Sequence, residues 1–83
     1  MQKVTIYTRQ FCPYCTRALA VLETKPVEIE QIDAGMDPAR KQEMVTRASG
    51  ARTFPQIFIG DTHIGGCDDL LALERKGQLD RML

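Results

Sequence analysis

Two cysteines separated by two residues, at the start of a predicted helix, form the first candidate for chemistry in this sequence. The segment Cys12-Pro13-Tyr14-Cys15 follows residues 3–8, whose alternating apolar and polar residues predict a β-strand. Further apolar residues recur with Cys15 at the helical spacings of three and four, namely Ala18, Leu19 and Leu22. We therefore expect Cys12 at the helix N-cap and Pro13 at the first helical position, where its missing N–H costs nothing.

The predicted position of Cys12 would make its sulfur a nucleophile. The free N–H groups of a first helical turn and the helix dipole favour a thiolate over a thiol, and Arg9 adds nearby positive charge. A thiolate attacks disulfides, and Cys15, one helical turn later, can be the resolving thiol. The alternative is half of a zinc site, which needs four ligands, usually in two pairs. Only Cys67 and His63 could complete such a site, so we expect a redox dithiol and no metal.

Length and composition bound the class of protein. The chain has 83 residues, which we interpret as a single domain over residues 1–83. Its 11 basic and 11 acidic residues balance, which gives no electrostatic footprint for nucleic acid or an anionic membrane. No apolar run approaches the roughly 20 residues of a membrane span, and no signal-peptide pattern is visible at the N-terminus. Three cysteines, two of them in a C-x-x-C pair, favour a reducing cytoplasmic setting.

Turn and capping residues predict the remaining elements. Pro26 blocks continuation of the first helix, and Asp37-Pro38 is an N-cap followed by a proline that opens a second helix. Gly50 ends that helix, and Gly60-Asp61 is a short turn between two strands. We expect helices at about residues 13–24, 38–49 and 68–77, and strands at about residues 3–8, 27–32, 56–59 and 62–64.

The order β-α-β-α-β-β-α predicts an α/β fold. The first two strands should be parallel and joined by a right-handed helical crossover, and the last two should form an antiparallel hairpin. A C-x-x-C motif at the start of the first crossover helix is typical of a thioredoxin-like fold. We therefore predict a four-stranded mixed sheet with three helices.

Two further segments could contribute to a binding site. Pro55 either starts a strand or forms a cis peptide bond with Phe54, which would leave the Phe54 backbone free to pair with an extended substrate. The segment Gly65-Gly66-Cys67-Asp68-Asp69 runs into a helix start, where Asp68 or Asp69 could cap the helix. The same helix start could instead bind a carboxylate, with an Asp beside it pairing with an ammonium group.

Several single residues have more than one interpretation. Tyr14 is either a surface aromatic or a wall for a small thiol ligand, and Cys67 is a core-like residue, a second redox thiol or a backbone contact. His63 is interpreted as a strand-surface residue. The basic side chains of the second half of the chain mostly indicate a solvated face, namely Arg40, Lys41, Arg47 and Arg52.

Taken together, these segments resemble the glutaredoxin family, and in particular its small dithiol bacterial type. The resemblance covers nearly the whole chain. The segments that carry it are Val4-Thr5-Ile6-Tyr7-Thr8, Cys12-Pro13-Tyr14-Cys15, Thr53-Phe54-Pro55-Gln56-Ile57-Phe58-Ile59 and Gly65-Gly66-Cys67-Asp68-Asp69-Leu70.

The resemblance implies a thioredoxin-like fold, a cis Pro55 and glutathione as the co-substrate. The γ-glutamyl end of glutathione would lie against Cys67 and Asp68, and its cysteine would pair with the backbone of Phe54. Two departures from the family are Arg9, where Lys is frequent, and Phe54, where Val is usual. The first keeps the charge, and the second could narrow the groove or alter substrate preference.

The resemblance also implies contacts to the rest of the ligand. Its glycine end would meet Arg9 and the ring of Tyr14, and Thr53 would belong to the same glutathione-binding set. We thus expect an enzyme, a glutathione-dependent thiol-disulfide oxidoreductase, in which Cys12 attacks and Cys15 resolves. Its partners would be disulfide-bearing or glutathionylated proteins, and we expect a cytoplasmic monomer. The alternatives are an electron donor reduced by a flavoprotein and a glutathione-ligated iron–sulfur carrier, in which Cys12 from two chains would bind the cluster.

Overall fold

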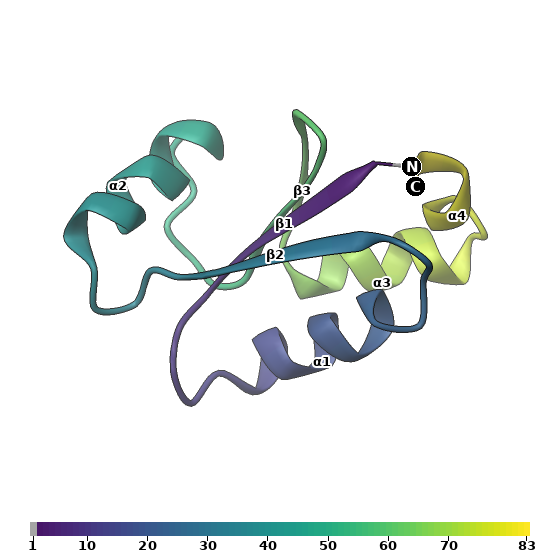
Figure 1. Cartoon of the computed structure of the whole chain (residues 1–83), viewed down its shortest axis with the longest axis horizontal. Coiled ribbons are helices and arrows are strands. Elements are labelled where there is room, and N and C mark those ends of the chain that lie inside the picture. Colours follow the sequence, from purple (N-terminus) through teal and green to yellow (C-terminus); the bar gives the residue numbers. More distant parts are fainter. Residues whose placement is uncertain (1) are drawn as a thin grey trace.

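A four-stranded mixed β-sheet lies at the centre of the computed structural model, which describes residues 2–83 (Figure 1). The strands lie in the order β2-β1-β3-β4, with β1 parallel to β2 and antiparallel to β3, and β3 antiparallel to β4. This confirms the predicted parallel pair and the predicted hairpin. The strands are β1 (Lys3–Thr8), β2 (Glu28–Asp33), β3 (Gln56–Ile59) and β4 (Thr62–Gly65).

The three predicted helices are present, and a fourth, short helix follows them. Gly77, with φ of 68°, ends the turn after α3, and the fully buried Leu79 begins the added helix. A single helical turn contains too few residues to show a periodic pattern, so the prediction of three helices was incomplete. The helices are α1 (Pro13–Leu22), α2 (Pro38–Arg47), α3 (Cys67–Arg75) and α4 (Leu79–Met82).

The two faces of the sheet are covered by different helices. Alternate strand residues point to opposite faces, so one face of β1 carries Val4 and Ile6 and the other carries Tyr7. The main core joins Val4 and Ile6 to residues of α1 and α3, whereas Tyr7 and Phe58 pack against α2 in a smaller core. Figure 1 shows α1 and α3 on one side of the sheet and α2 on the other.

The helix boundaries differ from the predicted ones by a few residues. Helix α1 ends at Leu22 instead of residue 24, and the Thr24 hydroxyl donates to the Val21 carbonyl at 2.6 Å in the turn that follows. Helix α2 ends at Arg47, and Ser49 and Gly50 then adopt φ of 55° and 99°. Gly50 therefore lies in the helix-ending position that the sequence predicts, two residues beyond the C-cap.

One ion-pair group ties the end of α1 to the C-terminal helices. The Lys25 ammonium lies 2.9 Å from a Glu74 carboxylate oxygen of α3 and 2.9 Å from an Asp80 oxygen of α4. Hydrogen bonds to Glu74 and Asp80 raise the pKa of Lys25. This group anchors the end of α1 opposite to the cysteine pair.

Candidate active site

Cys12 is the N-cap residue of α1, as the sequence predicts. Its backbone is extended, with φ of −115° and ψ of 99°, and Pro13 occupies the first helical position. The Cys12 sulfur accepts a hydrogen bond from the Cys15 backbone N–H at 3.2 Å. The N–H dipoles of the first helical turn point toward a sulfur in this position, and they stabilise a thiolate more than a thiol.

Cys15 lies one turn further along α1 in a different environment. Burial raises the pKa of the Cys15 thiol to about 11, and the hydrogen bond and negative charge of Cys12 act in the same direction. A backbone hydrogen bond and the charge of Arg9 oppose this shift more weakly. At neutral pH, Cys15 therefore keeps its proton, and the asymmetry of the pair favours Cys12 as the attacking sulfur.

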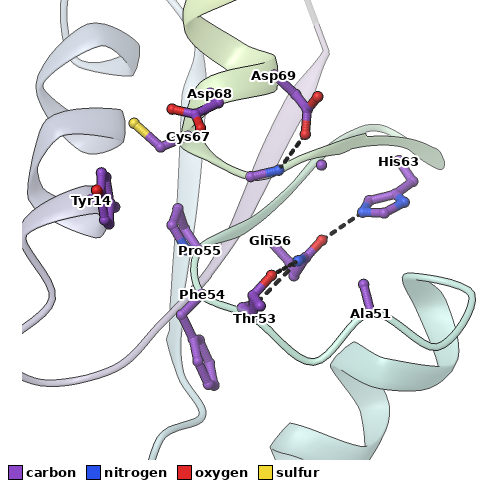
Figure 2. A pocket seen from close by; sticks show the side chains of 12 residues that line it. Tyr14, Ala51, Thr53, Phe54, Pro55, Gln56, His63, Cys67, Asp68 and Asp69 are labelled. Carbon is purple, nitrogen blue, oxygen red and sulfur yellow. Dashed lines mark hydrogen bonds between the residues drawn. The ribbon is translucent and has the colours of Figure 1, made fainter.

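A cavity of about 400 Å³ lies beside this pair, between the start of α1, the segment before β3 and the start of α3 (Figure 2). It brings together residues from three parts of the chain that the sequence analysis singled out separately. Of the nine predicted site residues, the cavity is lined by Tyr14, Thr53, Phe54, Pro55, Cys67 and Asp68. The two cysteines and Arg9 line a neighbouring cavity of about 410 Å³.

Arg9 contacts the loop that precedes Cys12 and also borders the Thr53–Phe54 segment. Its guanidinium donates to the carbonyls of Gln10 and Phe11, at 3.2 and 3.4 Å, and so braces the loop before Cys12. Arg9 also lines a third cavity, of about 430 Å³, together with Thr53 and Phe54. Two other cations line that cavity, namely Lys41 and Arg52, which the sequence analysis assigned to a solvated face.

The peptide bond between Phe54 and Pro55 is cis, which confirms the prediction. Across residues 2–83, no turn or loop hydrogen bond between backbone groups involves Phe54. The Phe54 ring packs against the small core beneath α2, and Figure 2 shows it directed away from Pro55 and Tyr14. Phe54 still lines the cavity, but its ring is directed toward the core beneath α2, so of the two consequences that the sequence left open the structure does not favour a narrowed groove.

At the start of α3, the two aspartates have separate roles. Gly66 is the N-cap residue, and the Asp69 carboxylate accepts its N–H at 3.0 Å. Gly65 has φ of 118°, and a Cβ at this position would overlap the Asp69 carboxylate, so only glycine fits. Asp69 therefore performs the capping role, and Asp68, exposed beside Cys67, remains available to a ligand (Figure 2).

Cys67 is the first residue of α3 and lies in the main core, with only 4% of its surface exposed. Burial raises the pKa of its thiol, and the charge of Arg17 opposes this effect while the charges of Asp68 and Cys12 add to it. Of the three interpretations that the sequence left open, this environment favours the core-like one.

A polar pair at the edge of the cavity was not predicted from the sequence. His63 was expected to be a strand-surface residue and is indeed exposed, but His63 also lines the cavity, and its Nε2 lies 2.7 Å from the Gln56 amide oxygen. Gln56 in turn donates to Thr53 (Figure 2). The available signal was a polar residue, Gln56, at the start of an otherwise apolar strand.

The fold and the cysteine pair define a thioredoxin-like dithiol protein, and comparisons with known proteins narrow this class. Residues 4–64 match the glutaredoxin family model. Glutaredoxin 3 of Escherichia coli strain K12 is 49% identical over 83 residues, which is 100% of this chain and 99% of that protein. The chain therefore belongs to the glutaredoxin family, and it is a glutathione-dependent thiol-disulfide oxidoreductase.

Two solved structures support the same assignment. The solution structure of a glutaredoxin from Brucella melitensis is 57% identical, with a TM-score of 0.85, and the match covers 100% of this chain and 89% of that one. A buckwheat glutaredoxin–glutathione complex is 30% identical, with a TM-score of 0.84, and the match covers 99% of this chain and 76% of that one. These structures confirm the predicted thioredoxin-like fold.

Within residues 2–83, no group of three or more His, Cys, Asp or Glu side chains is arranged to hold a metal ion. No helix within the same residues has the length and apolar character needed to cross a membrane.

Proposed function

We propose that this glutaredoxin reduces protein disulfides and glutathione mixed disulfides, with Cys12 as the nucleophile and Cys15 as the resolving thiol. The observation that carries the assignment is the asymmetry of the pair. The Cys12 sulfur accepts a first-turn N–H, whereas burial raises the pKa of Cys15 to about 11. One sulfur is thus prepared to attack and the other holds a proton until a mixed disulfide has formed.

In the dithiol reaction, the Cys12 thiolate attacks one sulfur of a protein disulfide. The substrate S–S bond breaks, a Cys12–substrate disulfide forms, and the departing sulfur takes up a proton. Cys15 then loses its proton and attacks the Cys12 sulfur, which releases the second substrate thiol and leaves a Cys12–Cys15 disulfide. Two glutathione molecules reduce that disulfide in two exchanges and leave as oxidised glutathione.

The monothiol reaction needs only Cys12. Its thiolate attacks the glutathione sulfur of a glutathionylated protein, so the protein thiol departs and glutathione stays bound through Cys12. A second glutathione thiolate attacks this mixed disulfide, which releases oxidised glutathione and restores the Cys12 thiolate. Cys15 takes no part in this cycle.

The cavity supports an orientation for the glutathionyl group. The α-carboxylate of the γ-glutamyl end would accept hydrogen bonds from the free N–H groups at the start of α3. The α-ammonium of the same end would pair with the exposed Asp68. The cysteine of glutathione would pair with the Phe54 backbone, beside Thr53 and Pro55. At the other end, the glycine carboxylate would meet Tyr14 and Arg9. The buckwheat glutaredoxin–glutathione complex has the same fold, which supports glutathione as the ligand.

The direct test is glutathione-coupled reduction of a glutathionylated peptide. We expect one molecule of oxidised glutathione per peptide thiol released, with a rate that depends on glutathione concentration. Absence of this turnover would contradict the proposal. Turnover by a flavoprotein reductase without glutathione would instead favour the electron-donor alternative, against which the cavity at the start of α3 argues, because a donor needs no such site.

The partners and setting complete the proposal. We expect a monomer that acts in the cytoplasm on disulfide-bearing or glutathionylated proteins and has no resident metal. Size-exclusion chromatography with light scattering tests the monomer. A visible absorption spectrum of the freshly purified protein tests the iron–sulfur alternative, because a cluster held by two chains would absorb in the visible range and elute as a dimer.

A further inference from the structure

Gln56 is a buried polar residue whose hydrogen bonds all point toward the edge of the cavity. Its side chain is 3% exposed, at the start of β3 on the face that α2 partly covers. Its amide nitrogen donates to the Thr53 carbonyl oxygen at 3.0 Å and to the Thr53 hydroxyl oxygen at 3.1 Å. Its amide oxygen lies 2.7 Å from Nε2 of His63. A buried amide keeps such a set of partners because leaving any of them unpaired is costly.

The chemistry of the three groups fixes the direction of these hydrogen bonds. The Thr53 carbonyl can only accept, so the NH₂ end of the Gln56 amide must face Thr53. The oxygen end then faces His63, and His63 must carry its proton on Nε2 in order to donate. The hydrogen bonds therefore run in one direction, from His63 as donor to Gln56, and from Gln56 as donor to Thr53 (Figure 2). The Thr53 hydroxyl oxygen accepts from Gln56, so its own proton is free for an acceptor on a ligand.

The ring of His63 is itself held in place. It stacks on the buried ring of Phe58, with 4.9 Å between centroids and 27° between planes. Phe58 pairs with His63 across β3 and β4, and the Arg47 guanidinium lies 4.3 Å from the Phe58 ring centroid. His63 is thus oriented by the sheet and by stacking, and it passes that orientation to Gln56 through a single hydrogen bond.

We propose that His63 is a positioning residue for glutathione, which acts by fixing the Gln56 amide and, through it, the Thr53 carbonyl and hydroxyl at the edge of the cavity. The inference rests on the proposed glutathione site. His63 lines the same cavity, but it would act on the ligand through Gln56 and would not touch the reacting sulfurs. Its loss would let the Gln56 amide rotate toward water, and the Thr53–Phe54 segment would spend less time in the geometry that pairs with the glutathione cysteine.

Three substitutions separate the hydrogen bond from the ring. His63→Phe keeps a ring that can stack on Phe58 but has no donor. His63→Gln restores an N–H donor without the aromatic ring. Thr62→Ala changes the neighbouring exposed residue of β4, whose side chain points to the other face of the sheet, and is the matched control.

The measurements are the KM for a glutathionylated peptide, kcat, the alkylation rate of Cys12 and the thermal midpoint. For His63→Phe we expect a rise in KM of about three- to tenfold, the range for one neutral hydrogen bond. We expect kcat to change by less than about twofold and the alkylation rate of Cys12 to stay unchanged, because the sulfur is untouched. The thermal midpoint should fall only slightly, because the Gln56 amide oxygen loses one neutral hydrogen bond. His63→Gln should return KM to near the wild-type value, and Thr62→Ala should match the wild type.

A second comparison tests whether His63 and Gln56 act through one series of hydrogen bonds. Gln56→Met removes both of the links, so adding His63→Phe to it should raise KM by less than about twofold further, because residues in one hydrogen-bond network are not additive. A full additional effect would overturn the relay through Gln56.

The outcomes that defeat this inference differ from those that defeat the proposed function. An unchanged KM in His63→Phe, or an equal rise in His63→Gln, would overturn the role of the donor while wild-type turnover stands. A parallel fall in thermal midpoint and alkylation rate in His63→Phe would make His63 a structural residue only. A wild-type protein that does not turn over glutathionylated peptide would overturn both.

Discussion

The start of α1 and the start of α3 both border the cavity and both contain a cysteine, yet the two cysteines meet different surroundings. At α1, the cysteine is the N-cap, and the Cys12 sulfur accepts a backbone N–H at 3.2 Å. At α3, the N-cap is Gly66, and Cys67 is one residue later, where burial raises the pKa of its thiol. A shift of one residue relative to the cap thus decides whether a cysteine meets free N–H groups or the core.

The capping groups of the two helices differ in the same way. At α1 the sulfur itself caps the helix, so its chemistry and the helix start are coupled. At α3 the Asp69 carboxylate accepts a hydrogen bond from the Gly66 N–H. The other N–H groups of the first turn of α3 are available to a ligand. In the proposed function, one helix end therefore presents the nucleophile, and the other binds the charged groups of glutathione.

The largest expected difference separates Cys12 from Cys67. Cys12→Ser should lower both disulfide-reducing activities by about a thousandfold or more, because the attacking thiolate is lost. Cys67→Ser should retain both activities within a few-fold, since its thiol is buried and protonated. Alkylation at neutral pH measures the same contrast without substrate. If Cys67→Ser lost the fast-reacting thiol and Cys12→Ser kept it, the comparison between the two helix starts would be wrong.

The next effect separates the two members of the pair. Cys15→Ser should keep most of its activity on glutathionylated peptide but lose at least about tenfold in reduction of a protein disulfide, because only the second reaction needs a resolving thiol. The two assays should be run on the same preparation, with Cys12→Ser as the inactive reference. Equal losses in the two assays would argue against separate roles for the two sulfurs.

The third prediction tests the division of labour between the aspartates of α3. Asp68→Asn should raise the KM for glutathione by about tenfold, since a charge-assisted hydrogen bond contributes roughly 1.5–3 kcal/mol. Asp68→Asn and Asp68→Ala should both leave the thermal midpoint nearly unchanged, because Asp69 makes the capping bond. Asp69→Ala should instead lower stability by about 1 kcal/mol. A stability loss in Asp68→Ala that matched the loss in Asp69→Ala would contradict this division.

The smallest expected effect is a change of stability with pH. Burial raises the folded-state pKa of Cys15 from 9.0 to about 11, so the folded protein keeps a proton that the unfolded chain releases. The contribution of this thiol to stability is therefore complete below about pH 9 and falls as pH rises toward 11. Thermal midpoints measured between pH 8 and 11 should decline less in Cys15→Ala than in the wild type. Identical slopes would mean that Cys15 is not buried as a thiol.

Much of the fold could be predicted because local patterns and global packing agree. Pro13, Asp37 and Gly50 mark helix boundaries by properties of the residues themselves, and the structure has them at those positions. The single turn of α4 could not be predicted, since burial of Leu79 against the core, and not local pattern, holds it. The same limit applies to the ion-pair group of Lys25, Glu74 and Asp80, whose members are distant in sequence.

The sequence by itself determined the cysteine pair, the helix that begins at it, the order of the strands and of the first three helices along the chain, and the family, because each depends on residue type and short spacing. Only the tertiary structure decided which aspartate of α3 caps the helix, that the Phe54 ring turns toward the α2 core, and that His63 bonds to Gln56 at the cavity edge. These outcomes depend on which side chains from separate strands and helices reach one another, and on how deeply each is buried. The spacing of residues along the chain specifies neither these contacts nor the depth of burial.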